Sequence, residues 1–186
     1  MSLTYSTKPH FGTPAPDFSL PGTDNQTYSL QDLSKADILV VVFTCNHCPY
    51  AQASHPVLID LHNAYSDRGI QFVAINANDE SAYPLDSLSH MQEDRYDYPF
   101  PYLRDETQDV ARAYGAVCTP DLFVYNRERT LVYHGRINDN WQRPDAVTRH
   151  DLREALDALL AGTTPDVDQH PSMGCSIKWR SLGDAA

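Results

Sequence analysis

Cys45 and Cys48 stand in a C-x-x-C spacing within CNHCPY, where a run of β-branched residues ends and a helical pattern begins. Two thiols at this spacing can carry redox chemistry, hold a soft metal ion or fill space in the core. At a helix N-terminus, unpaired N–H groups and the positive end of the dipole stabilise a thiolate. We therefore predict that Cys45 is a nucleophile and that Cys48, one turn along and more buried, is the resolving thiol. A donating or protonated His47 between them favours the Cys45 thiolate further.

A metal site is the alternative to redox chemistry at this pair. Cys45, Cys48 and one histidine would offer a soft site for copper. The candidate histidines are His47, His55 and His134. The four cysteines and eight histidines show no second paired spacing of the kind that zinc sites use. We therefore expect no metal and no other cofactor, and we keep a copper-binding protein as a second hypothesis.

The elements that flank the cysteine pair form a βαβ unit. The run 37–44, DILVVVFT, is continuously apolar and β-branched, which predicts a strand buried on both faces of a sheet. Apolar residues then recur at spacings of three and four up to Tyr65, which predicts an amphipathic helix that Pro56 interrupts. The run 69–77, GIQFVAINA, is a second buried strand, and a right-handed crossover makes the two strands parallel.

Patterns on either side of this unit predict the remaining elements. They are a hairpin before the unit, short helices at 85–94 and 108–115, a hairpin at 121–137 and a helix at 147–162. In the last helix Thr148 and Asp151 resemble a capping box. Residues 1–10 are assigned to a disordered or extended N-terminus.

The order of these elements, together with three separated motifs, resembles the thioredoxin fold. The motifs are CNHC, CTPD at 118–121 and an N-terminal G-x-x-A-P-D-F-S-L, and the resemblance covers residues 11–161. The N-terminal motif further resembles the redoxin branch, which includes AhpC/TSA-related, peroxiredoxin-like proteins with an F-x-C-N-H-C-P-Y motif. The resemblance implies an α/β domain over residues 11–162, with a central mixed sheet flanked by helices. It also implies a thiol–disulfide oxidoreductase that uses the Cys45–Cys48 couple, with an antioxidant role among its possible duties.

The same resemblance assigns roles to further residues. Thr119 and Pro120 match the loop whose cis-proline faces the catalytic pair, and this leaves the Thr119 backbone free to pair with an extended substrate chain. His47 is similar to the histidine of oxidising relatives such as protein disulfide isomerase. Glu80, beside Asp79, resembles in placement the acid/base residue of some thioredoxin-like proteins of cytochrome maturation. A solvated pair of loop carboxylates is the alternative for these two residues.

Departures from the family pattern bear on the chemistry. Leu39 and Thr44 stand where thioredoxin has a buried aspartate and a tryptophan. The proton acceptor for Cys48 therefore comes from elsewhere in the chain or is water. Counting back from Cys45 or Cys48 finds no P-x-x-x-[TS]-x-x-C motif, in which a hydroxyl orients the peroxide. Efficient peroxidase activity is disfavoured, and a weak peroxiredoxin-like peroxidase stays an alternative.

Composition limits the partners. The chain has 186 residues and a formal charge of −11, with 14 Lys plus Arg against 25 Asp plus Glu. Such a surface repels phosphate backbones and anionic lipid, so we expect neither nucleic acid nor a membrane as partner. The sequence shows no signal peptide and no run of about 20 apolar residues, which predicts a cytoplasmic protein. The expected partners are protein or small-molecule disulfides and thiols, together with a reductase that donates electrons.

Cys118 and Cys175 are two further thiols whose placement the sequence leaves open. Residues 163–186 follow the helix that completes the fold, and we expect them to form an irregular tail that packs on the domain. Cys175 is either a small buried filler under this tail or an auxiliary thiol. Our sharper hypothesis is that the tail folds back towards CTPD, so that Cys175 or Cys118 can exchange with the Cys45–Cys48 disulfide.

Overall fold

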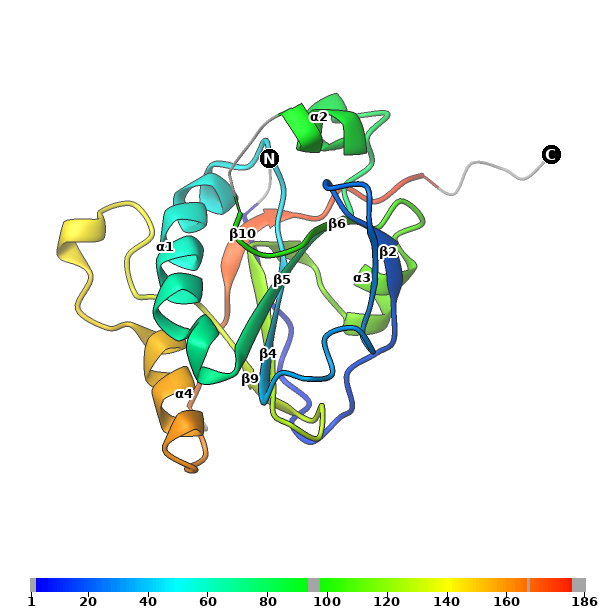
Figure 1. Cartoon of the computed structure of the whole chain (residues 1–186). Coiled ribbons are helices and arrows are strands. Elements are labelled where there is room, and N and C mark those ends of the chain that lie inside the picture. The colour runs from blue at the N-terminus through cyan, green and yellow to red at the C-terminus, as the bar shows by residue number, and fades with distance from the viewer. Residues whose placement is uncertain (1–2, 94–97, 167, 182–186) are drawn as a thin grey trace.

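A five-stranded mixed sheet forms the centre of the molecule in a computed structural model that describes residues 3–93, 98–166 and 168–181 (Figure 1). In the sheet order β6-β5-β4-β8-β9, the strands are β6 Tyr102–Arg104, β5 Ile70–Asn76, β4 Ile38–Phe43, β8 Asp121–Tyr125 and β9 Leu131–His134. Strands β4, β5 and β6 pair in parallel, whereas the β4–β8 and β8–β9 pairs are antiparallel. Every residue of β4 is buried, as expected for a strand covered on both faces.

Helices cover both faces of this sheet because the residues of β4 alternate between two cores. Val40 and Val42 pack with residues of α1 Pro49–Tyr65 and α4 Asp151–Leu160. Val41 and Phe43 pack on the other side with α3 Asp109–Tyr114 and the hairpin strand β2. The remaining elements of this domain are β2 Ser19–Pro21, β3 Thr27–Ser29, α2 Leu88–Glu93 and the 3-10 turns η1 Ser66–Arg68, η2 Pro84–Asp86 and η3 Pro144–Ala146.

A second, three-stranded sheet joins both ends of the described chain to the CTPD loop. Its strands, in the order β1-β10-β7, are β1 Leu3–Tyr5, β10 Met173–Ser176 and β7 Cys118–Thr119, and both pairs are antiparallel. The expectation of an irregular tail is therefore wrong for β10. Pairing with two distant strands, rather than any local pattern, makes this segment extended. Residues 1–2 of the N-terminus and residues 167 and 182–186 of the tail lie outside the described residues.

The predicted strands and helices of the core are confirmed, with differences inside two helices. α1 continues through Pro56, because Leu58 and its neighbours pack on the sheet on the far side of the proline. The predicted capping box is wrong, because α4 begins only at Asp151 and the Thr148 hydroxyl donates to Asp139 instead. Residue 94, the expected end of the helix that contains α2, lies outside the described residues.

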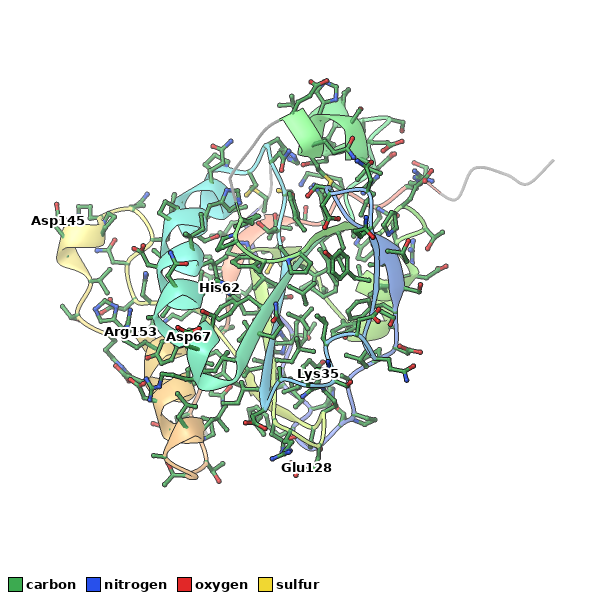
Figure 2. The ribbon with its side chains drawn as sticks, in the orientation of Figure 1. Lys35, His62, Asp67, Glu128, Asp145 and Arg153 are labelled. Atoms are coloured by element: carbon green, nitrogen blue, oxygen red, sulfur yellow. The ribbon has the colours of Figure 1, made fainter. Side chains whose placement is uncertain are left out.

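Charged side chains cover the outside of these layers. Lys35, Asp67 and Glu128 are exposed and project away from the ribbon (Figure 2). The large apolar side chains are instead divided between the two cores, one on each face of the central sheet. Across the parts of the chain that the structure describes, no helix has the length and apolar character needed to cross a bilayer.

Candidate active site

The CNHC loop connects the carboxyl end of β4 to the first turn of α1. This helix begins at Pro49, and Cys48 is its N-cap residue. The prediction that Cys45 stands at the helix N-terminus, with Cys48 one turn inside, is therefore wrong. Pro49 explains why the helix starts later than predicted, because proline favours the first helical position, where its missing N–H costs nothing. The Ala51 N–H of the first turn consequently faces the Cys48 sulfur.

Both thiols of the C-x-x-C pair contact the loop between β7 and β8. The Thr119–Pro120 peptide bond is cis. Cys45 Sγ lies 3.2 Å from the Thr119 hydroxyl, and Cys48 Sγ lies 3.4 Å from the Thr119 carbonyl oxygen. Cys45 and Cys48 are free thiols with 0% of their surface exposed. The structure therefore brings these four predicted site residues together, in an arrangement that is closed to solvent.

The backbone beside the cis-proline is already paired within the chain. In the β7–β10 register, Cys175 lies opposite Thr119 and Ser176 lies opposite Cys118. The expectation of a free Thr119 backbone is therefore wrong, because the C-terminal strand occupies this edge. A Cβ on Gly174 would lie 2.0 Å from the Thr119 carbonyl oxygen, so glycine is what permits this close approach.

The C-terminal strand adds a third thiol to the pair. Cys175 packs with Cys45 and Cys48 in one small cluster, and its thiol is hydrogen-bonded to that of Cys48. Cys118 behaves differently, because its thiol donates to the Pro120 carbonyl at 3.5 Å. The structure thus distinguishes two cysteines that the sequence left equivalent.

A buried carboxylate, Asp86, organises the CNHC loop. Its oxygens accept hydrogen bonds from the Asn46 N–H at 2.8 Å, the Asn76 amide at 3.0 Å and the Asn78 amide at 2.9 Å. His47 Nδ1 donates to the same carboxylate at 2.5 Å. The other ring nitrogen of His47, Nε2, is buried and has no hydrogen-bond partner among the described residues.

Asp86 is ionised within this network. Burial alone would raise the pKa of Asp86, but hydrogen bonds from His47, the Asn46 backbone and Asn76 outweigh burial and hold the pKa below its ordinary value. The resulting negative charge lies close enough to Cys45 to disfavour a thiolate there.

Sequence reasoning missed Asp86 and named Glu80 as the tentative acid/base residue. Glu80 forms an ion pair with Arg104 at 3.3 Å, and the acid that faces the cysteine loop is Asp86. Asp86 lies 39 positions from His47, in a polar, aromatic and proline-rich segment. No periodicity or spacing motif could have linked these two residues in the sequence.

Burial and mutual hydrogen bonds set the protonation of the three clustered thiols. Burial raises the pKa of Cys45 well above its ordinary value, and the hydrogen bond to Cys48 acts in the same direction. The hydrogen bond from Cys45, helped by one from Cys175, lowers the pKa of Cys48 to about 4 against the opposing effect of burial. Burial and the bond to Cys48 raise the pKa of Cys175 to about 12. The Cys45–Cys48 pair therefore carries one negative charge in the closed form, and the nucleophilic role of Cys45 stays a prediction.

Of the histidines considered as metal ligands, His47 alone among those described lies in a group with a site cysteine. His55 and His134 form buried hydrogen bonds with other side chains. Ligand atoms of Cys45, His47 and Asp86 lie within 4.8 Å of one another. A metal ion on this group would compete with the hydrogen bonds that Asp86 already accepts, so the donor set favours redox chemistry over metal binding.

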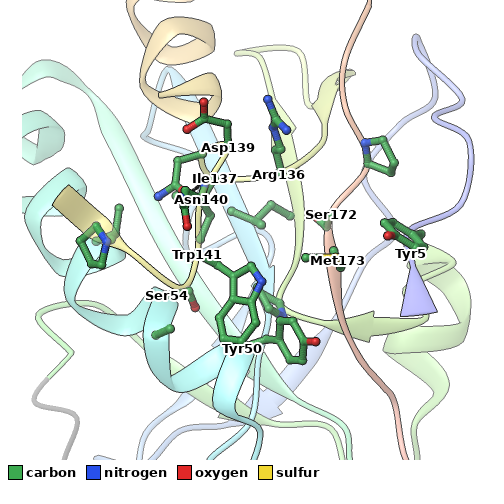
Figure 3. Close-up of a pocket in the computed structure, with 17 residues that line it drawn as sticks. Tyr5, Tyr50, Ser54, Arg136, Ile137, Asp139, Asn140, Trp141, Ser172 and Met173 are labelled. Atoms are coloured by element: carbon green, nitrogen blue, oxygen red, sulfur yellow. Dashed lines mark hydrogen bonds between the residues drawn. The ribbon is translucent and has the colours of Figure 1, made fainter. Parts of the chain in front are cut away.

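A pocket of about 280 Å³ adjoins the cis-proline (Figure 3). Pro120 contributes to its lining together with the rings of Tyr50 and Trp141, whose centroids lie 4.0 Å apart. Tyr50 also packs against the cysteine cluster, which places the pocket next to the redox pair. Arg136 lines the pocket as well, but its guanidinium is paired with Asp151 at 2.9 Å. The pocket therefore suits an apolar or aromatic group.

Solved structures similar to this chain support the fold. An uncharacterized conserved protein from Geobacillus kaustophilus is 43% identical, with a TM-score of 0.90 and 97% of each chain covered. A hypothetical protein from Sinorhizobium meliloti 1021 is 41% identical, with a TM-score of 0.89, and the match covers 96% of this chain and 99% of that one. The thioredoxin domain of a thiol-disulfide oxidoreductase from Bacteroides vulgatus is 20% identical, with a TM-score of 0.55 over 67% of this chain and 86% of that one. The fold is thioredoxin-like, as predicted.

Sequence comparisons agree with the structural ones. The thiol-disulfide oxidoreductase ResA of Halalkalibacterium halodurans is 26% identical over 121 residues. That match spans 65% of this chain and 65% of the relative's length. Residues 11–134 match the AhpC/TSA family, which confirms the predicted redoxin ancestry. The chain belongs to the AhpC/TSA family.

Proposed function

We propose that this protein is a thiol–disulfide oxidoreductase that works through the Cys45–Cys48 couple. The observation that carries the proposal is the contact of both sulfurs with Thr119, next to the cis-proline, while one negative charge is shared by the pair. A relative in Halalkalibacterium halodurans is a thiol-disulfide oxidoreductase by name, and the family match covers both cysteines.

One proton passes between the two sulfurs of the pair. With the proton on Cys45, the Cys48 thiolate accepts the Cys45 S–H bond. With the proton on Cys48, that thiol donates to the Thr119 carbonyl at 3.4 Å, and the Thr119 hydroxyl donates to the Cys45 thiolate at 3.2 Å. Both states are hydrogen-bonded, so the pair can place the nucleophile on Cys45.

The reaction then follows thiol–disulfide exchange. The Cys45 thiolate attacks one sulfur of a substrate disulfide, which forms a mixed disulfide and releases the other substrate sulfur as a thiolate. Cys48, after losing its proton, attacks the Cys45 sulfur, releases the second substrate thiolate and closes the Cys45–Cys48 disulfide. Two electrons have moved to the substrate, and an electron-donating reductase restores the dithiol. The same steps in reverse oxidise a substrate dithiol.

His47 serves as the proton carrier in this proposal. Because Nδ1 donates to Asp86, the lone pair of the neutral ring is on Nε2, the nitrogen without a partner among the described residues. Nε2 accepts the proton that the pair gives up and returns it to the thiolate that leaves the Cys45 sulfur, because ligand atoms of Cys45 and His47 lie within 4.8 Å of each other. Asp86 is a positioning residue, which fixes the tautomer and the orientation of the ring.

The substrates in this proposal are protein or small-molecule disulfides and thiols. The pocket beside Pro120 accepts an apolar or aromatic group next to the reacting sulfur. The four free cysteines suit the reducing conditions of the cytoplasm, where we place the activity. An antioxidant role follows if the substrates are disulfides produced by oxidative damage.

Reduction of insulin disulfides by dithiothreitol tests the proposal. We expect wild-type protein and a Cys118→Ser control to accelerate the reaction, and Cys45→Ser and Cys48→Ser to be inactive. Cys48→Ser is expected to accumulate a mixed disulfide with the substrate, because its resolving thiol is missing. A wild-type rate no faster than dithiothreitol alone would overturn the proposed function, and equal trapping by both single variants would overturn the assigned roles.

One contact favours weak peroxidase activity as a second candidate. The Thr119 hydroxyl lies 3.2 Å from Cys45 Sγ, so a distant segment supplies the hydroxyl that the sequence motif lacks. Hydrogen peroxide consumption with dithiothreitol as reductant measures this activity. A Cys45→Ser variant that consumes peroxide as fast as wild type would remove this candidate.

A further inference from the structure

The three clustered thiols have an order that the proposed reaction does not use. Cys48 is the middle sulfur, with hydrogen bonds to Cys45 on one side and Cys175 on the other. All three side chains are buried, with exposed fractions of 0%, 0% and 2% for Cys45, Cys48 and Cys175. The geometry therefore gives Cys48 two potential disulfide partners.

The strand that carries Cys175 stands where an extended substrate would pair with the cis-proline loop. Cys175 lies directly opposite Thr119 in an antiparallel register. On its other side, β10 pairs with β1, where Leu3 lies opposite the same cysteine. The close contact at Gly174 holds the strand against the loop. Cys175 is thus presented to the redox pair as a cysteine within a built-in substrate strand.

We propose that Cys175 is a third redox thiol, which exchanges with the Cys45–Cys48 disulfide to form a Cys48–Cys175 disulfide. This inference rests on the proposed function, because that reaction generates the disulfide. The Cys175 thiol loses its proton and attacks the Cys48 sulfur, the Cys45–Cys48 bond breaks, and Cys45 leaves as a thiolate that takes up the proton. The step is an isomerisation, with no net change in electrons.

The exchange has two consequences for the protein. Cys45 becomes a free thiol again, while the oxidising equivalents are stored in the Cys48–Cys175 disulfide. The new bond also links β10 covalently to Cys48, the N-cap residue of α1. The C-terminal segment therefore cannot leave the cis-proline loop until a reductant breaks this disulfide. A Cys45–Cys48 disulfide leaves this segment held only by non-covalent contacts.

Cys118 offers a matched control for this role. It lies on the strand next to β10, opposite Ser176, and is as buried as the other cysteines. Its thiol donates to the Pro120 carbonyl. Position therefore distinguishes the two residues, because Cys175 packs in one cluster with Cys45 and Cys48 and Cys118 lies outside that cluster.

Disulfide mapping after oxidation with glutathione disulfide tests the proposal. Tryptic peptide 36–68 carries both Cys45 and Cys48, peptide 154–178 carries Cys175 and peptide 113–127 carries Cys118. Protein at low micromolar concentration is oxidised, alkylated at its remaining thiols and digested, and only the monomer fraction is analysed. We expect a 36–68/154–178 cross-link in which Cys45 is alkylated. The Cys118→Ser variant is expected to give the same cross-link.

A Cys45→Ser variant separates this inference from the proposed function. We expect glutathione disulfide to convert it fully to the Cys48–Cys175 species, because Cys175 resolves the Cys48–glutathione adduct. A persistent Cys48–glutathione adduct, with wild type yielding only the Cys45–Cys48 link, would overturn the third-thiol role and leave the proposed function intact. Absence of any Cys45–Cys48 link in wild type and in Cys175→Ala would count against the proposed function itself.

Discussion

Replacing Gly174 by alanine tests whether β10 closes the redox site. The added Cβ would lie 2.0 Å from the Thr119 carbonyl oxygen and 2.6 Å from its carbonyl carbon, both of them backbone atoms. Ordinary contact needs about 3.4 Å, so the strand must move away by roughly 1.4 Å. A shift of this size breaks the two pairs that join β10 to β7, Cys175 with Thr119 and Ser176 with Cys118.

The loss of this pairing sets the size of the expected effect. Two backbone hydrogen bonds contribute about 1–3 kcal/mol together, which is roughly a 5- to 150-fold change in the equilibrium between closed and open site. Cys45 and Cys48 have 0% exposure, so a reagent reaches them only after opening. We therefore expect Gly174→Ala to increase their alkylation rates by about the same factor.

The assay is iodoacetamide alkylation of the reduced protein at neutral pH, followed by mass spectrometry of peptide 36–68. Gly162→Ala is the matched control, because its Cβ meets nothing within 4 Å and the site lies at the end of α4. This control introduces strain at a left-handed glycine and should leave the alkylation rates unchanged. Rates for Gly174→Ala within twofold of wild type would refute the view that β10 shields the thiols.

Three further predictions concern charge and the pocket. The pKa of Cys48 in the folded protein, about 4, lies below its value in the unfolded chain. The stability that this thiolate contributes is therefore complete above the unfolded pKa and is lost as the pH falls towards 4. The free energy of unfolding of the reduced wild type, measured in urea, should rise from pH 5 to pH 8, and that of Cys48→Ser should rise less. Asp86→Asn points an amide at buried donors and should lower the unfolding free energy by about 2–3 kcal/mol, whereas Asp60→Asn, at an exposed carboxylate of α1, should lower it by less than about 1 kcal/mol. Trp141→Ala removes the ring packed on Tyr50 and should raise KM about 5- to 10-fold for a peptide disulfide with an aromatic neighbour, with kcat unchanged and no effect on a serine-flanked peptide.

The elements nearest the cysteine pair were predictable because they depend on local patterns. A continuous β-branched run predicts a strand buried on both faces, and β4 has no exposed residue. Since the carboxyl end of such a strand feeds the next helix, the placement of the CNHC loop between β4 and α1 followed from the same pattern, but the start of the helix at Pro49 did not. The approach of Thr119 and Pro120 came from the family resemblance rather than from any spacing in this sequence.

Features built from long-range pairing were not predictable in the same way. Met173–Ser176 contains glycine, serine and cysteine, and its strand conformation depends on partners at both Thr119 and Leu3. Asp86 is distinguished only by four donors that converge on it in the folded chain. The contact of Cys175 with the cysteine pair was open for a related reason, since it depends on the pairing of β10 with β7.

Burial of all three thiols means that catalysis requires a local opening, and the packing indicates where it occurs. β1 is weakly held, because the side chains of Leu3 and Tyr5 are 51% and 56% exposed. Ile177, directly after β10, is instead buried in the core, and its N–H donates to the Val117 carbonyl at 2.9 Å. Its neighbour Lys178 continues this anchor through the hydrogen bonds its carbonyl accepts. Elements with few buried contacts open at the lowest free energy, so β1 should open first. Gly174 and Cys175 of β10 are buried, so β10 should follow only when its pairing with Thr119 breaks, and it should pivot at Ile177. That motion would release the Thr119 edge to a substrate and withdraw Cys175 from Cys48, which makes substrate binding and the third-thiol exchange mutually exclusive steps of one cycle.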